Sequence, residues 1–142
     1  MRNTPLAKLF ISLVFVTFSS AIYAQQNNLA YAVAWKQTAA EHLALYHQAF
    51  NIAKIQVETA IARRHEPQKP LAIISDVDET LLLANSYWGY MIANGEDFFD
   101  DAVWDLWVEE DLFTASPGSL EFAEFCRQNN VKIFYITNRD QG

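Results

Sequence analysis

The stretch LAIISDVDET at residues 71–80 joins a short apolar run to a group of acidic side chains. The apolar run 71–74 follows Pro70 and is typical of a strand that is buried on both faces, as in a parallel sheet. Asp76 and Asp78 follow this run and stand two residues apart. If the extended conformation continues to Asp78, both carboxylates lie on one face of the chain.

A second β-rich run, VKIFYIT at residues 131–137, follows the insertion 81–116 and a helix that we expect to end near Gln128. The order strand, helix, strand predicts a parallel pair in an α/β fold, with the helix as the crossover. In such sheets, ligands bind at the edge where the strands have their carboxyl ends. We therefore expect Thr137 and Asn138, which follow the second strand, to lie near the acidic pair.

Upstream of the first strand, apolar residues recur every three or four positions from Trp35 to Ile61. This periodicity predicts one amphipathic helix. Thr38 and Glu41 have the spacing of a capping box, so we expect the helix to begin at Thr38. Two prolines in the linker that follows prevent the helix from continuing.

Residues 1–24 have the layout of a secretory signal peptide, with an apolar run at 9–18 and small residues after it. Cleavage after Ala21 and cleavage after Ala24 both fit this pattern. The run is shorter than the roughly 20 residues that span a bilayer, which favours a cleaved leader over an uncleaved anchor. We therefore expect an exported protein, periplasmic or secreted, that keeps no stable membrane anchor after cleavage.

The composition indicates a single acidic domain with a hydrophobic core. The chain has 142 residues, of which 51% are hydrophobic, and this excludes a disordered acidic tail. Its formal net charge of −7 argues against a nucleic-acid partner. The single cysteine, Cys126, excludes a disulfide within the chain, and its apolar helical surroundings predict a buried thiol.

Two carboxylates as close as those of Asp76 and Asp78 repel each other unless they share a cation. A hard divalent ion with oxygen ligands, Mg²⁺ above all, removes this repulsion and screens a phosphate from the acidic protein. One carboxylate can then attack phosphorus and the other can act as acid and base, while the hydroxyl of Thr137 binds a phosphoryl oxygen. A bare pair with this spacing has a second interpretation, in which both aspartates only cap a turn.

Several ordered segments resemble the class C (lipoprotein e(P4)-like) acid phosphatases of the haloacid dehalogenase superfamily. They are AWKQTAAEHLALYHQAF (34–50), SDVDET (75–80), WDLW (104–107), SPG (116–118) and KIFYITNRD (132–140). The resemblance covers essentially the whole mature chain. It implies a Rossmannoid parallel sheet with an N-terminal helix and a cap insertion after the first strand. It also implies a Mg²⁺-dependent enzyme that hydrolyses small phosphomonoesters, often nucleoside 5′-monophosphates, at acidic pH.

The resemblance assigns roles to individual residues. Asp76 matches the nucleophile and first metal ligand of the family, and Asp78 matches the general acid and base, whose backbone carbonyl is a second ligand. Thr137 matches the phosphate-binding residue, with Asn138 beside it. Trp104 is similar to the aromatic residue that stacks on a nucleobase, and packing in the cap core is the alternative for this side chain.

Other polar residues near these motifs receive simpler interpretations. Arg139 lies beside the expected site, where it either assists a phosphate or pairs with Asp140 in solvent. His42 and His47 are five residues apart, which does not align them on one helix face, so we expect both at the surface or in packing between helices.

The sequence departs from the family pattern in two places. The run 83–87 stands where the family usually has an Asp-Asn-Ser-Pro-like segment. The sequence also stops at Gly142, before the positions of the family's third-motif lysine and fourth-motif acidic pair. We therefore expect residues 25–142 to be the N-terminal part of the domain, incomplete at the C-terminus and inactive alone. The alternative is a non-catalytic remnant that binds a metal or a nucleotide, and the oligomeric state stays open.

Overall fold

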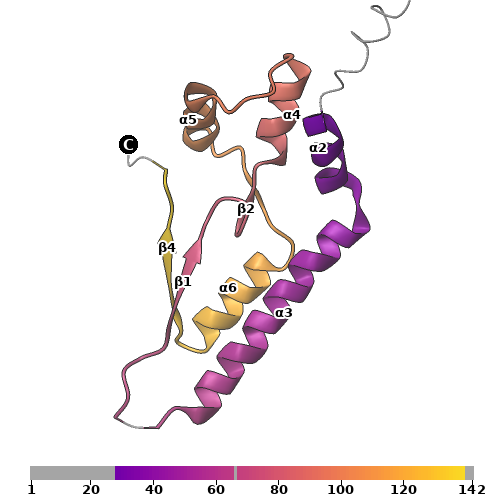
Figure 1. Cartoon of the computed structure of the whole chain (residues 1–142). Helices are drawn as coiled ribbons and strands as arrows, with labels where there is room; N and C mark the ends of the chain where they lie inside the picture. The colour runs from indigo at the N-terminus through magenta and orange to yellow at the C-terminus, as the bar shows by residue number, and fades with distance from the viewer. Residues whose placement is uncertain (1–27, 66, 140–142) are drawn as a thin grey trace, which may run out of the picture.

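The computed structural model describes residues 28–65 and 67–139 (Figure 1). The expected signal peptide at 1–24 and Asp140 lie outside these residues. The described elements are α2 (Asn28–Thr38), α3 (Ala40–Arg63), β1 (Ala72–Asp76), β2 (Leu82–Leu83), α4 (Asn85–Ala93), α5 (Asp101–Glu109), β3 (Thr114–Ala115), α6 (Ser119–Gln128) and β4 (Lys132–Ile136). None of the described helices combines the length and the apolar character needed to cross a membrane.

The strands β1 and β4 form the parallel pair that the order of elements predicts. Their register runs from Ala72 opposite Lys132 to Asp76 opposite Ile136. Helix α6 connects the insertion to β4 and ends at Gln128, as expected. Asn130, just beyond the helix, has a φ of 57°, a left-handed conformation that asparagine tolerates better than most residues.

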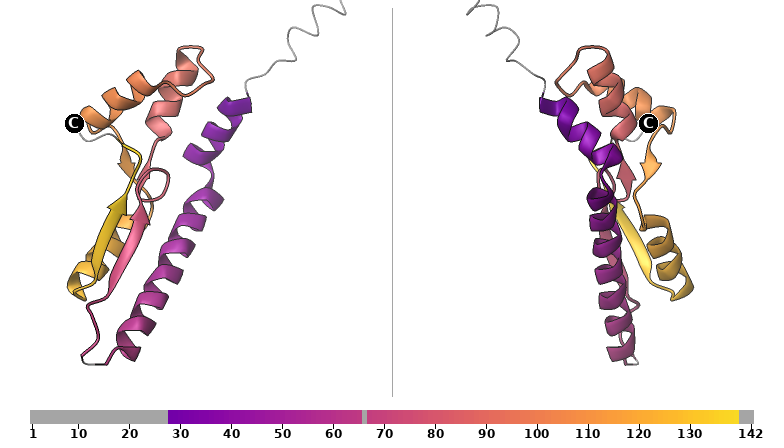
Figure 2. Two further views of the ribbon diagram at one scale, coloured as in Figure 1. Left: turned by 60° about the vertical axis from the view of Figure 1, so that its left-hand side comes forward. Right: turned by 90° about the vertical axis from the view of Figure 1, so that its right-hand side faces the viewer.

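One face of this strand pair is covered by helices and the other is open. Ile73 and Ile133 pack with α3 and α6 in a cluster around three buried side chains, those of Phe122, Cys126 and Val131. Figure 2 shows α3 running alongside the strands. Cys126 is fully buried, as predicted, and burial raises the pKa of its thiol.

The neighbouring side chains on the strands point to the opposite face, where Ile74 is 72% exposed and Phe134 is 55% exposed. The prediction that β1 is buried on both faces is therefore wrong for the described residues. The physical reason is that α3 and α6 share one cluster with one face of the pair, and side chains alternate between faces along a strand.

The N-terminal segment forms two helices, so the prediction of one helix beginning at Thr38 is wrong. Ala39 interrupts the helix with an extended backbone (φ −78°, ψ 123°) and is the N-cap of α3. The Thr38 hydroxyl donates a hydrogen bond to the carbonyl of Ala34 (2.7 Å) and therefore does not cap α3. The break allows α2 to pack on α4, whereas α3 packs on α6.

His42 stabilises this break from a buried position between the helices. Its Nδ1 lies 2.8 Å from the carbonyl oxygen of Lys36, in the last turn of α2. Because a carbonyl oxygen only accepts, the ring hydrogen is on Nδ1 and satisfies one of the acceptors that a helix end leaves without a partner. The ring also contacts Trp35 (4.8 Å) and Tyr46 (5.1 Å), so His42 is the packing residue that the sequence indicated.

The insertion, residues 81–116, contains α4 and α5 and lies at the carboxyl ends of β1 and β4 (Figure 1). At its base β2 and β3 pair antiparallel, with Leu82 opposite Ala115. Its centre is Tyr87, which is fully buried and whose hydroxyl both donates to the carbonyl of Asp100 and accepts from its N–H. Aromatic rings surround Tyr87, so the insertion has a core of its own.

Two glycines with positive φ allow a matched test of this architecture. Gly118, the N-cap of α6, has a φ of 86°, and a Cβ added there would lie 3.3 Å from both His47 and Phe50. Gly95 has a φ of 78°, but a Cβ there would meet nothing within 4 Å. We expect Gly118→Ala to lower the free energy of unfolding by about 1–3 kcal/mol, through backbone strain and close contact together. Gly95→Ala introduces backbone strain without a close contact, so it should lower the free energy of unfolding by less. Urea denaturation measures both variants, and equal losses of stability would contradict this account.

Candidate active site

The segment after β1 turns back sharply on itself. The strand ends at Asp76, and the N–H groups of Leu81 and Leu82 both donate to the carbonyl of Val77, at 2.8 and 2.9 Å. The ladder with β4 ends at Asp76, and Asp78 instead forms an isolated bridge with Leu82, so the continuous strand that was expected to reach Asp78 is not present.

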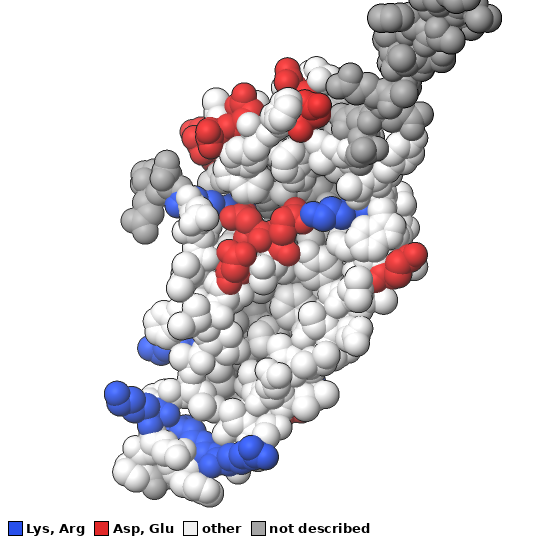
Figure 3. Space-filling model, viewed as in Figure 1, with Lys and Arg blue, Asp and Glu red and all other residues white. Residues whose placement is uncertain are grey.

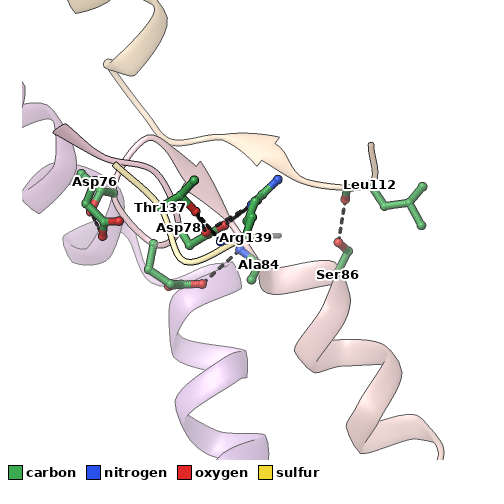
Figure 4. Close-up of polar contacts among 9 residues, drawn as sticks. Asp76, Asp78, Ala84, Ser86, Leu112, Thr137 and Arg139 are labelled. Carbon is green, nitrogen blue, oxygen red and sulfur yellow. Dashed lines mark hydrogen bonds and ion pairs between the residues drawn. The ribbon is translucent and has the colours of Figure 1, made fainter. Parts of the chain in front are cut away.

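Asp78 meets residues that follow β4. The hydroxyl of Thr137 donates to Asp78 Oδ2 at 3.1 Å, and Arg139 Nε donates to Oδ1 at 3.0 Å. A second guanidinium nitrogen, Nη2, also binds Oδ1, which completes an ion pair between side chains that are only 15% (Arg139) and 23% (Asp78) exposed. Figure 4 shows these three side chains converging. The predicted meeting of the two strand ends is therefore present in the structure.

Asp76 stands at the same edge with a different set of contacts. Its backbone is in register with Ile136, the residue before Thr137. Its carboxylate accepts a hydrogen bond from the hydroxyl of Thr80 (3.2 Å) and is exposed. Within the described part of the chain, no three His, Cys, Asp or Glu side chains form a ready-made metal site.

Arg139 was the residue whose partner the sequence left open. Asp78 is a partner in the structure, whereas Asp140 lies outside the described residues. The guanidinium also lies over the ring of Phe113, 4.1 Å from its centroid, and 5.9 Å from that of Trp104. Arg139 thus joins the acidic turn, the end of β4 and the aromatic wall of the insertion.

A cavity of about 460 Å³ opens beside this ion pair. Its lining residues come from the acidic turn, the insertion and the segment after β4, and they are Asp78, Phe99, Asp101, Trp104, Asp105, Asn138 and Arg139. The half-buried ring of Trp104 also packs on those of Tyr87, Phe99 and Phe113. Trp104 therefore belongs to the insertion core and faces the cavity as well, while Asp76 and Thr137 are not among its lining residues.

Glu79 is a residue that sequence reasoning missed. It adopts a left-handed backbone (φ 56°), and its carboxylate pairs with Lys36 of α2 and accepts from the N–H of Ala84 (3.0 Å). Its carbonyl accepts from the hydroxyl of Tyr46 in α3 (2.7 Å). Burial, together with the charge of Glu79, raises the pKa of Tyr46. The signal was available in part, because Lys36 and Tyr46 lie in one of the segments that resemble the family.

The segment 83–87, where the sequence departs from the family pattern, holds the insertion together. Ser86 accepts a hydrogen bond from the indole of Trp107 (3.0 Å) and donates to the carbonyl of Leu112 (2.9 Å). These contacts connect the start of α4 to the end of α5, and Figure 4 shows the bond from Ser86 to Leu112. They give this run a structural role.

With this geometry in place, comparison with known proteins identifies the class. The model of the HAD superfamily, subfamily IIIB (acid phosphatase), matches residues 16–142, and the chain belongs to this family. Its α/β fold with a parallel sheet is the fold of that family.

Two solved structures are similar to the chain. One is the class C acid phosphatase from Bacillus anthracis, with 32% sequence identity and a TM-score of 0.74. The other is the class C acid phosphatase from the same organism with tungstate bound, with 31% identity and a TM-score of 0.74. Each match covers 81% of this chain and 47% of the other, so the chain spans about half the length of these structures.

The contacts of Glu79 lead to a stability prediction. Tyr46→Phe removes the hydroxyl that binds the Glu79 carbonyl and should lower the free energy of unfolding by about 1 kcal/mol, the usual net value of such a hydrogen bond. Tyr90→Phe is the matched control, because the exposed Tyr90 packs its ring on Trp107 and its hydroxyl has no hydrogen bond in the described structure. Urea denaturation of both variants measures the difference, and similar losses would show that the Tyr46 bond contributes nothing specific.

Proposed function

We propose that the protein is an exported, Mg²⁺-dependent acid phosphatase that hydrolyses small phosphomonoesters through a phosphorylated Asp76. The observation that carries this proposal is the hydrogen bond from Thr137 to Asp78 at the carboxyl edge of the parallel pair. Asp76 lies at the same edge, because its strand partner is Ile136, the residue just before Thr137. Membership of the acid phosphatase family and the likeness to the Bacillus anthracis enzyme support it.

In the first step, a carboxylate oxygen of Asp76 attacks phosphorus and forms an acyl phosphate. The bond between phosphorus and the ester oxygen breaks, and the carboxylic acid of Asp78 gives its proton to the departing oxygen, which leaves as an alcohol. The Asp76 carboxylate is suited to this role because it is exposed and its hydrogen-bond partner among the described residues is the neutral hydroxyl of Thr80.

In the second step, Asp78 accepts a proton from a water molecule while the water oxygen attacks phosphorus. The bond between phosphorus and Asp76 breaks, which releases inorganic phosphate and restores both carboxyl groups. The hydroxyl of Thr137 lies beside Asp78 and can donate to a phosphoryl oxygen. Donors of this kind stabilise the charge that develops during phosphoryl transfer.

The residues at this edge fit a magnesium ion. Asp76 and Asp78 offer hard oxygen ligands, and Mg²⁺ is commonly bound by one or two carboxylates together with water and substrate phosphate. When bound, the ion screens the negative charge of phosphate from that of the protein. Asp76 is open to such a ligand, because no cation of the described residues pairs with it.

The cavity beside Asp78 is the proposed place for the leaving group. Trp104 lines this cavity and offers a flat ring on which any nucleobase can stack, whatever its type. Nucleoside 5′-monophosphates are therefore candidate substrates. Asn138 lines the same cavity from the end of β4. The proposal of export rests on the leader pattern of residues 1–24.

Replacement of the nucleophile tests the reaction. Asp76→Asn keeps the shape of the side chain but removes its nucleophilic oxygen, so kcat should fall by about a thousandfold or more. The assay uses protein expressed from the complete reading frame, with a chromogenic phosphomonoester at about pH 5. Asp97→Asn is the control, since Asp97 is exposed and lies outside the cavity, and circular dichroism checks the fold of both variants. Full activity of Asp76→Asn would refute the proposed nucleophile.

Metal removal tests the cofactor separately. Treatment with EDTA followed by dialysis should abolish turnover, and added Mg²⁺ should restore it, because the phosphate charge is no longer screened when the ion is absent. Metal analysis of the dialysed protein is the control for complete removal. Undiminished turnover by protein free of metal would overturn the Mg²⁺ requirement while leaving the nucleophile assignment intact.

A further inference from the structure

The insertion has an unusual distribution of charge. Residues 81–116 contain eight acidic side chains and no Lys, Arg or His. Figure 3 shows acidic side chains at the top of the molecule, where the insertion lies, and a second acidic group in the middle with basic side chains beside it; further basic side chains lie at the lower end. A phosphatase with such an insertion surrounds the leaving group of an anionic substrate with further negative charge, which requires an explanation.

Two of these carboxylates line the cavity beside Asp78. They belong to Asp101 and Asp105 of α5, and they lie with the rings of Phe99 and Trp104 around the same space. The neighbouring Asp100 has a structural role, since its carboxylate caps α5 by accepting from the N–H of Val103. No hydrogen bond or ion pair of the described structure gives Asp101 or Asp105 a comparable side-chain role.

The positive charge at this cavity is already engaged. Arg139 is the one basic residue of the lining, and its guanidinium is bound by the carboxylate of Asp78. The carboxylates of Asp101 and Asp105 therefore have no cation from the described residues of the cavity wall. A ligand with a positive charge would meet them without having to displace a protein cation.

The aromatic wall also suits a cation. The guanidinium of Arg139 lies over the ring of Phe113 and near that of Trp104, so this wall already carries one cation in the protein itself. Aromatic faces attract ammonium and guanidinium groups through their quadrupole, and quaternary ammonium groups are bound in this way in many sites. Phe99 and Trp104 are the aromatic residues that line the cavity together with Asp101 and Asp105.

We propose that this cavity is a leaving-group subsite that selects phosphomonoesters whose alcohol carries a positive charge, such as a quaternary ammonium. The inference rests on the proposed phosphatase function and adds the substrate class. The ester phosphate lies at Asp76 and Asp78, and the cationic part of the alcohol contacts Trp104, Asp101 and Asp105. Uncharged leaving groups of the same shape gain no electrostatic benefit from these carboxylates.

A matched pair of substrates tests the proposal. Choline phosphate and 3,3-dimethylbutyl phosphate have nearly the same shape. Choline phosphate has a positively charged quaternary nitrogen at the position where the other ester has a neutral carbon. Protein from the complete reading frame should show a kcat/KM about fivefold or more higher for choline phosphate, the change expected from one cation contact of ordinary strength. Asp105→Asn should lower this ratio about twofold or more, because it removes one of the two carboxylates that face the cation.

Control variants separate this effect from a general loss of charge. Glu109→Gln makes the same change of charge on the same helix but outside the cavity, so it should keep the wild-type ratio. Asp101→Asn is a second cavity variant, and it should also lower the ratio of kcat/KM for the two esters. The variant should still fold, because the cap of α5 is supplied by Asp100.

The outcomes distinguish this proposal from the one on which it rests. Hydrolysis of both esters with equal kcat/KM, or an equal effect of Glu109→Gln and Asp105→Asn on the ratio, overturns the cationic subsite and leaves the phosphatase intact. If neither ester is hydrolysed although the chromogenic phosphomonoester is, the subsite fails alone; if the chromogenic ester is not hydrolysed either, the proposed function fails and the subsite fails with it.

Discussion

Parallel pairing of β1 with β4 brings Asp76 level with Ile136, and this register places two loops of distant sequence at one edge. Thr137 and Arg139 then reach Asp78 across a separation of about sixty residues. The pairing is itself held by the cluster of Phe122, Cys126 and Val131, which α3 and α6 build against one face of the strands. A loss of register by one residue would turn these side chains to the other face and separate the groups of the site.

Charge compensation explains how three carboxylates are tolerated within four residues of the acidic turn. Glu79 pairs with Lys36 from α2, and Asp78 pairs with Arg139 from the segment after β4. Asp76 accepts from the hydroxyl of Thr80 and has no described cation, so its charge is the least compensated of the three. The least compensated carboxylate is thus the one that we propose as the nucleophile.

The groups that we propose to react and those that we propose to set specificity come from different parts of the chain. The strand ends supply Asp76, Asp78 and Thr137, whereas the insertion supplies the aromatic and acidic wall of the cavity. The insertion has its own core around Tyr87 and is closed at its base by β2 and β3. Its surface can therefore vary with the substrate without disturbing the strand pair on which the chemistry depends.

The sequence alone determined the order strand, crossover helix, strand, the end of α6 at Gln128, and the position of the acidic motif at the end of a strand. These features follow from local hydrophobic patterning and from the resemblance of short segments such as SPG (116–118). Tertiary structure alone decided the helix break at Ala39, the one-sided burial of β1 and the ion pairs of Asp78 and Glu79. The partners in those pairs lie 43 and 61 positions apart, and similar charges occur elsewhere in the chain. Local pattern cannot choose between such partners, because the choice depends on how the helices dock on the strands.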